Sequence, residues 1–245
     1  KLLQEIEPKT STDKILFFPD LAFNPYIKVI KVNNSPSNII KQKNLLRIKG
    51  SIGITVRQLN FTSNSQDEYL LAISKLCEDL IESGEKITIF PHVIGPIYFE
   101  DDRQPSKKLY FSLAARYPDS VFLFNDKYDA LELAYYYSLL KIMIGTRFHS
   151  VIFSLREKVP AFAISYNGPK ADIMNLFGMK EYMIDKEDVT LKNVQDMFIK
   201  VSRLIKERKE LSNSISKTMD KLDAFFDTIY LTNIVTKLAA EEKLN

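Results

Sequence analysis

The sequence predicts an α/β protein built on a doubly wound, Rossmann-like parallel sheet. Between residues 51 and 188, short apolar segments alternate with amphipathic segments of helical period, which indicates β-α-β units. The apolar segments are continuous runs, as expected for strands that helices cover on both faces. Ligands bind such sheets just beyond the carboxyl ends of the strands. The residues that follow each predicted strand are therefore the first candidates for a functional site.

The predicted elements follow one another in a regular order. Strands are expected over residues 52–56, 86–90, 120–124, 141–144, 160–164 and 181–184. Helices are expected over 66–83, 105–117, 130–140, 146–158 and 171–177. In the first helix, apolar residues at 70, 73, 76, 77, 80 and 81 form one face, and Gly84 follows as a C-cap.

The segments on either side of this unit have a different character. Residues 2–7 resemble the end of a helix and 13–18 a short strand, whereas 24–50 are rich in Asn, Pro, Ser and Lys and indicate a linker. From Thr190 onward a nearly unbroken apolar stripe predicts packing helices rather than a coiled coil. A basic cluster there is expected to be a solvated face rather than a lipid-facing patch; it comprises Arg203, Lys206, Arg208 and Lys209. The chain thus divides into residues 1–50, 51–188 and 189–245.

Composition excludes several classes of protein. With 245 residues, 45% hydrophobic and 27% charged, the chain has the make-up of a soluble globular protein. A net charge of +3 is too small for a nucleic-acid footprint. The single cysteine, Cys77, excludes an internal disulfide and is expected to be a buried, inert thiol. The sequence shows no signal peptide and no apolar run of about 18 residues, so we expect a cytoplasmic protein without a transmembrane segment.

The most informative stretch runs from Ile142 to Leu155. A short apolar strand leads into Gly145, and Thr146 is placed to cap the helix that follows. Arg147 and His149, one of only two histidines in the chain, stand at the start of that helix. The first amides of a helix have no intrahelical acceptor, and the helix dipole adds positive potential there. This junction therefore predicts an anion site.

Other polar residues follow the remaining strands. They are Arg57, His92, the run Glu100–Arg103 with its acids Asp101 and Asp102, Asp126, and residues 166–170 ending in Lys170. Each has a structural alternative: an edge salt bridge for Arg57, a structural hydrogen bond for His92, and solvated loops for the others. No GxGxxG, Walker, HExxH, GxSxG or Cys/His ligand pattern is present, so we expect neither a cofactor nor a protein-bound metal.

Five sequence segments, taken together, resemble the polysaccharide pyruvyl transferase family. They are Gly-Ile-Thr-Val-Arg57, Phe-Pro-His92-Val-Ile-Gly-Pro, Glu-Asp-Asp-Arg103, Ile-Gly-Thr-Arg-Phe-His149-Ser-Val-Ile-Phe-Ser-Leu, and Val-Pro-Ala-Phe-Ala-Ile-Ser-Tyr-Asn-Gly-Pro-Lys170. The Arg-Phe-His motif and the last segment are the more specific. Pro19-Asp-Leu-Ala-Phe23 resembles the passage between that family's two domains.

The resemblance implies one half of a GT-B-like enzyme with two Rossmann-like domains. Residues 1–50 would then hold the end of a missing first domain and a linker, and residues 51–188 would bind the donor. The implied reaction moves a pyruvyl group from phosphoenolpyruvate to two hydroxyls of a sugar, in capsule, exopolysaccharide or cell-wall synthesis. The acceptor would be a sugar or a lipid-linked saccharide, and peripheral contact with the inner face of the membrane is left open.

The chemistry of that reaction suggests roles for the candidate residues. Arginine matches both anionic groups of phosphoenolpyruvate, so Arg57 and Arg147 are expected to bind the donor, with Arg103, Lys170 and Thr146 assisting. His149 is expected to act as acid or base, protonated chiefly when donor is bound. The partner group is left open between three residues, Asp102, Asp101 and His92.

Two other functions fit the same sequence. One is a GT-B glycosyltransferase that uses a nucleotide sugar, which shares the fold and the site at the strand ends. The other is a non-catalytic module of a polysaccharide assembly machine, which predicts that Arg147 and His149 tolerate substitution.

Overall fold

The structure is a computed structural model that describes residues 20–24, 39–59, 65–95, 100–125, 128–165 and 169–241. It contains a six-stranded sheet in which every pairing of neighbouring strands is parallel. The strands are β1 (Ile52–Thr55), β2 (Ile87–Ile89), β3 (Val121–Leu123), β4 (Ile142–Gly145), β5 (Ala161–Ser165) and β6 (Met183–Asp185). The predicted Rossmann-like α/β class is confirmed. The predicted helix and strand at 2–7 and 13–18 lie outside the described residues.

The strand order is β3-β2-β1-β4-β5-β6. The chain moves outward from β1 to β3, returns to the centre, and continues outward on the other side from β4. In the central pair, Ile54 lies opposite Ile144 and Thr55 opposite Gly145. The direction of winding reverses between these two strands, so their carboxyl ends flank the crevice where doubly wound sheets bind ligands.

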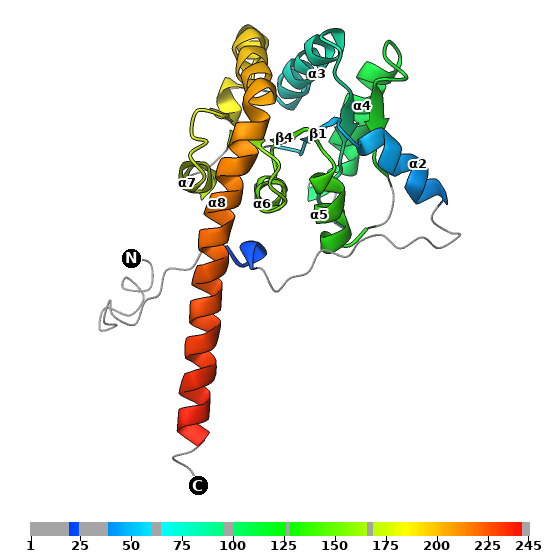
Figure 1. The fold of residues 1–245 in the computed structure, drawn as a ribbon. Coiled ribbons are helices and arrows are strands. Elements are labelled where there is room, and N and C mark those ends of the chain that lie inside the picture. Colours follow the sequence, from blue (N-terminus) through cyan, green and yellow to red (C-terminus); the bar gives the residue numbers. More distant parts are fainter. Residues whose placement is uncertain are drawn as a thin grey trace.

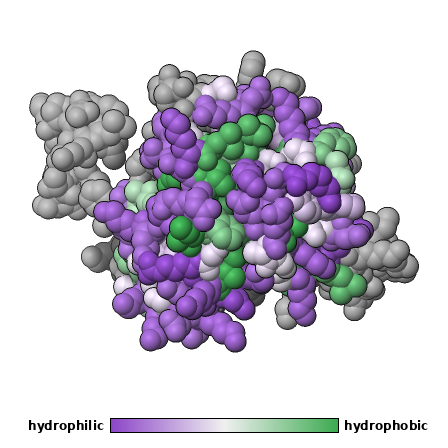
Figure 2. Space-filling model, turned by 90° about the horizontal axis from the view of Figure 1, so that it is seen from above, coloured by the Kyte–Doolittle hydropathy of each residue, from purple (hydrophilic) through white to green (hydrophobic). Residues whose placement is uncertain are grey.

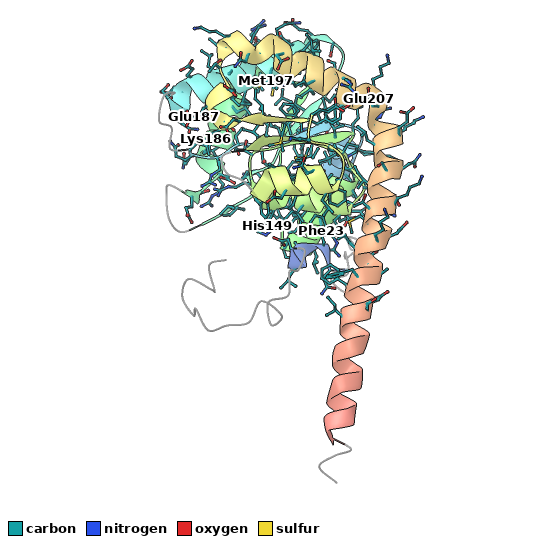
Figure 3. All side chains as sticks on the ribbon, turned by 90° about the vertical axis from the view of Figure 1, so that its left-hand side faces the viewer. Phe23, His149, Lys186, Glu187, Met197 and Glu207 are labelled. Carbon is teal, nitrogen blue, oxygen red and sulfur yellow. The ribbon has the colours of Figure 1, made fainter. Side chains whose placement is uncertain are left out.

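Helices cover both faces of this sheet (Figure 1). They are α2 (Ile39–Ile48), α3 (Gln66–Glu82), α4 (Arg103–Ala114), α5 (Ala130–Ser138), α6 (Phe148–Arg156), α7 (Pro169–Leu176) and α8 (Val194–Glu241), with short 3-10 helices η2 (Leu21–Phe23), η5 (Lys186–Asp188) and η6 (Leu191–Asn193). The first part of α8 lies with α3 on one face of the sheet, and α6 lies on the other (Figures 1 and 3). This coverage explains why the strands are uninterrupted apolar runs.

One predicted loop proved to be partly helical. Residues 24–50 were expected to form a linker, but α2 occupies Ile39–Ile48. Its last residue, Ile48, is fully buried, and the Ser51 hydroxyl donates a hydrogen bond of 2.8 Å to the Ile48 carbonyl. Six of its ten residues are Lys, Gln, Leu or Arg, all good helix formers. The Asn, Pro and Ser residues that precede this short helix favour loops, and for this reason the sequence predicted a linker for the whole segment.

The hydrophobic core contains side chains whose helical spacing predicted that they would be buried. Cys77 on α3 is fully buried, and this burial raises the pKa of its thiol to about 12. The thiol is therefore protonated at neutral pH, which confirms the expected inert cysteine.

The last helix, α8, follows the sheet and then turns away from it. Figure 3 shows the bend near Glu207. There the Tyr182 hydroxyl donates to Glu207 Oε2 at 2.5 Å, and Arg203 Nε donates to Glu207 Oε1 at 2.9 Å. Beyond the bend one face of the helix remains buried, through Ile215, Met219, Leu222 and Phe226. The helix then continues past the α/β layers (Figure 1).

The end of the molecule that carries α3 and the start of α8 has a mainly hydrophilic surface, interrupted by a hydrophobic seam (Figure 2). Within the part of the chain that the structure describes, no helix has both the length and the apolar character that crossing a membrane requires.

Candidate functional site

The turn between β4 and α6 lies at the centre of the candidate site. The N-cap of α6 is Arg147, with extended backbone, so the prediction that Thr146 caps this helix is wrong. The Thr55 hydroxyl, at the end of β1, accepts from the amides of Thr146 at 3.0 Å and Arg147 at 3.5 Å. Two of the amides expected to bind an anion are therefore already bonded. The first-turn amides of Phe148 and His149 remain as candidate donors, because a helix supplies no acceptor for them.

A buried hydroxyl network holds this turn against the neighbouring strand and helix. Tyr69 on α3 and Thr146 join their hydroxyls at 2.8 Å, and the hydroxyls of Thr55 and Ser150 meet at 3.0 Å. Thr55, Tyr69, Thr146 and Ser150 are all fully buried, so Thr146 supports the turn and does not offer its side chain to a ligand. Burial raises the pKa of Tyr69, which keeps the phenol neutral. Sequence analysis missed Thr55, Tyr69 and Ser150.

The close packing of this turn gives a first prediction. A Cβ at Gly145 would lie 2.7 Å from Val151 Cγ2 and 2.8 Å from Ser150 Oγ. Overpacking of this kind costs about 1–3 kcal/mol. Gly145→Ala is therefore expected to lower the free energy of unfolding by that amount in urea titrations. An unchanged urea midpoint would show that α6 can move away at no cost.

Arg147 and Asp102 form a buried ion pair at the crevice. Arg147 Nη2 donates to Asp102 Oδ1 at 2.6 Å and Nε to Oδ2 at 2.9 Å, and Nη2 also reaches the Glu100 carbonyl at 3.0 Å. Asp102 is fully buried and accepts from the Val93 amide at 2.9 Å. Burial raises the pKa of the Asp102 carboxyl, while Arg147, the Val93 amide and the charge of Arg57 oppose that rise.

This pair changes the expected roles of both residues. A fully buried Asp102 has no surface with which to touch a sugar hydroxyl, which contradicts its prediction as a base in contact with the acceptor. Arg147, only 9% exposed, directs Nε and Nη2 at Asp102 rather than at an open anion site. Both residues instead fix the β4–α6 turn.

The two histidines line one pocket. The pocket has a volume of about 470 Å³ and is formed by His92, Val93, Ile94, Tyr128, Asp129, Ala130, Leu133, His149 and Phe153. Phe153 lies between the imidazoles, with ring centroids 5.8 Å from His92 and 6.1 Å from His149. His92 Nδ1 forms a 2.9 Å hydrogen bond with the Tyr137 hydroxyl. The structure thus joins two residues that are 57 positions apart in the sequence.

His149 also faces a carboxylate that sequence analysis did not single out. Its side chain is 53% exposed, and Nε2 lies 3.8 Å from Asp20 Oδ2. Asp20 caps η2 by accepting from the Ala22 amide at 2.8 Å. Arg156 donates to the Ala22 carbonyl at 3.2 Å, which ties η2 to α6, and Figure 3 shows Phe23 of η2 beside His149.

The other predicted residues are more dispersed. Arg57 is half-buried, donates from Nε to the Gln58 carbonyl at 3.3 Å, and is near enough to Asp102 to act on its pKa. The Arg103 side chain is 44% exposed and pairs with Asp101 at 2.6 Å, which lowers the pKa of Asp101. Lys170 belongs to the first turn of α7, but its side chain, like residues 126 and 166–168, lies outside the described residues.

The six-stranded sheet and its covering helices have the Rossmann-like fold of the α/β units found in GT-B glycosyltransferases. A trehalose 6-phosphate synthase from Burkholderia multivorans superposes with a TM-score of 0.52 at 13% identity, over 86% of this chain and 47% of that one. The structure of trehalose-6-phosphate from E. coli bound with UDP-2-fluoro glucose also gives a TM-score of 0.52 at 13% identity, over 82% of this chain and 47% of its own. At this identity the likeness concerns the fold alone.

The family is defined by sequence. The chain belongs to the polysaccharide pyruvyl transferase family, whose model matches residues 2–168. The amylovoran biosynthesis protein AmsJ of Erwinia amylovora is 26% identical over 222 residues, which cover 84% of this chain and 52% of AmsJ. The chain therefore spans about half the length of this curated relative.

Proposed function

We propose that this protein is a pyruvyl transferase of polysaccharide synthesis that takes its pyruvyl group from phosphoenolpyruvate. Membership of the family and the similarity to an amylovoran biosynthesis protein support the reaction class and the polysaccharide setting. One structural observation carries the assignment of the site: His92 and His149 share one pocket beside the start of α6. A cytoplasmic position at the inner face of the membrane stays a prediction.

We expect the donor to bind at the open side of this pocket. Phosphoenolpyruvate carries a phosphate and a carboxylate, which the first-turn amides of Phe148 and His149 and the helix dipole stabilise. Arg57 supplies cationic charge on the β1 side of the crevice. Arg147 acts indirectly, because its pairing with Asp102 fixes the turn from which those amides point.

The two imidazoles provide an acid and a base. One donates a proton to the methylene carbon of the donor, which leaves an oxocarbenium-like centre at C2. A sugar hydroxyl attacks C2 and gives its proton to the other imidazole. The C2–O bond to phosphate then breaks with its electron pair, and the second hydroxyl closes the ketal, its proton leaving with phosphate. Histidine suits both steps because it titrates near neutral pH.

The main alternative is a glycosyltransferase that uses a nucleotide sugar, and the similarity of fold is what favours it. A thermal-shift titration separates the two readings. Phosphoenolpyruvate is expected to raise the melting temperature by mass action, and UDP-glucose is not. The opposite result would reject pyruvyl transfer, and no shift with either ligand would favour a non-catalytic module.

The carboxylate beside His149 gives a further prediction. Asp20→Asn keeps an oxygen that can cap η2 but removes the charge that steadies a protonated imidazole. We expect the turnover of the full-length protein to fall about ten- to a hundredfold, with the KM for phosphoenolpyruvate nearly unchanged.

Asp185→Asn is the matched control. Asp185 caps the 3-10 helix η5 by accepting from the Glu187 amide at 3.1 Å, just as Asp20 caps η2. Equal effects of the two substitutions on turnover would show that Asp20 serves only as a helix cap.

A further inference from the structure

A second pocket lies at the amino ends of the central strands, opposite the carboxyl ends that carry the histidine-lined pocket. Its volume is about 500 Å³, and four cationic side chains line it: Lys141, Lys158, Arg208 and Lys209. Lys141 directly precedes β4, Lys158 lies between α6 and β5, and the other two belong to α8. Figure 3 shows Lys186 and Glu187, which follow β6, at one end of the strands, and Glu207, which directly precedes Arg208, at the other end. The proposed transfer chemistry uses none of these four residues.

The backbone at Lys158 has a conformation that favours glycine, which indicates that the lysine side chain has a role other than local stability. Its φ of 63° is the only positive value among the described non-glycine residues. The amides of Lys158 and Val159 donate to the carbonyls of Leu155 and Ser154, both at 2.9 Å, which closes α6 in the way that glycine usually does. A lysine in this conformation is strained relative to glycine, so local stability alone would favour glycine.

The neighbouring groups hold the cations in place. The Ser212 hydroxyl donates to the Lys158 carbonyl at 2.8 Å, and Arg208 Nη1 donates to the Ile205 carbonyl at 2.7 Å. Lys141 pairs with Glu85, and Glu157 is the acid that lines the pocket. Burial raises the pKa of Glu157, although Arg156 and Lys158 oppose the rise. Because Glu85 offsets the charge of Lys141, the three cations Lys158, Arg208 and Lys209 against the single carboxylate of Glu157 leave the pocket with an excess of positive charge.

We propose that this pocket binds a phosphate-type oxyanion, either free phosphate or the phosphate of a lipid headgroup. The guanidinium and the ammonium groups supply charge-assisted donors, and Ser138 and Asn213 line the same pocket and add neutral ones. The competing explanation is that these cations only complement the carboxyl ends of α5 and α6. In that case the Lys158 side chain binds no ligand, and replacing it with glycine raises the stability of the protein without any loss of anion binding.

Calorimetric titration with inorganic pyrophosphate tests the proposal on the full 245-residue chain. Lys158→Gly is expected to weaken binding about fivefold or more while the melting temperature is unchanged or higher, because one charge-assisted contact is lost and strain is relieved. Adding Arg208→Gln should abolish measurable binding. The control Lys108→Gln removes an exposed lysine on α4 and should bind like the parent chain.

Vesicles identify the source of the phosphate. A lipid headgroup would be identified if the parent chain floats with phosphatidylglycerol vesicles but not with phosphatidylcholine vesicles, and if the double variant no longer floats with either. Pyrophosphate binding without flotation would identify a free phosphate. Two results would overturn the proposal: a parent chain that binds neither probe, or binding that survives in the double variant and is displaced by phosphoenolpyruvate.

Discussion

Replacing His149 with alanine is expected to lower the rate of ketal formation by about 10²- to 10⁴-fold, the usual loss when a general acid or base is removed. The side chain is half exposed, lines the pocket with His92, and lies at the N-terminal turn of α6. It is therefore open to a ligand in the pocket without supporting the core. The melting temperature should change little, and turnover should fall far more than the affinity for phosphoenolpyruvate.

His149→Gln is the companion variant, because it keeps a polar side chain of similar reach but cannot transfer a proton near neutral pH. Both variants should lose turnover to a similar extent, measured as phosphate release by the full-length protein. Undiminished turnover in the glutamine variant would reduce His149 to a hydrogen-bonding role. Undiminished turnover in both would remove it from the reaction.

Replacing Asp102 with asparagine is expected to cost about 3–5 kcal/mol of folding free energy, because Arg147 would be left buried without its counter-charge. The two residues share hydrogen bonds of 2.6 and 2.9 Å, and Asp102 is fully buried. Urea unfolding measures the loss. Because the pair also fixes the β4–α6 turn, activity should fall even without urea, under conditions in which the variant stays folded.

The adjacent Asp101→Asn is the control. Asp101 pairs with Arg103, whose side chain is 44% exposed, and solvent screens such pairs strongly. Its loss should be much smaller than that of Asp102→Asn. A double variant, Asp102→Leu with Arg147→Met, should recover stability but not activity, since it removes both buried charges. Equal stability losses for Asp101→Asn and Asp102→Asn would contradict a buried pair.

Much of the fold could be predicted from the sequence, because the strands are apolar runs and the long helices carry clear periodicity. The strand at 141–144 and the helix after it are found at Ile142–Gly145 and Phe148–Arg156. The short α2 was missed because ten residues give little periodicity against a polar background. The division into 1–50, 51–188 and 189–245 stays a prediction.

The site was harder to predict than the fold. The positions of His149 and His92 at strand ends are visible in the sequence, but their common pocket depends on the strand order, which periodicity does not contain. The Arg147–Asp102 pair joins residues 45 positions apart. A sequence does not show which side chains are buried, so it cannot distinguish a buried aspartate that neutralises an arginine from an exposed aspartate that acts as a base. Thr55 is the one missed residue with a visible signal, a hydroxyl at the end of an apolar strand.

The most direct test of pyruvyl transfer follows phosphoenolpyruvate and a saccharide acceptor together in the full-length protein. ³¹P NMR reports phosphate release, and mass spectrometry reports the acceptor. The predicted result is phosphate released only when acceptor is present, with the acceptor gaining the mass of pyruvic acid less water. Phosphate release without acceptor, or glycosyl transfer from a nucleotide sugar with phosphoenolpyruvate untouched, would contradict it.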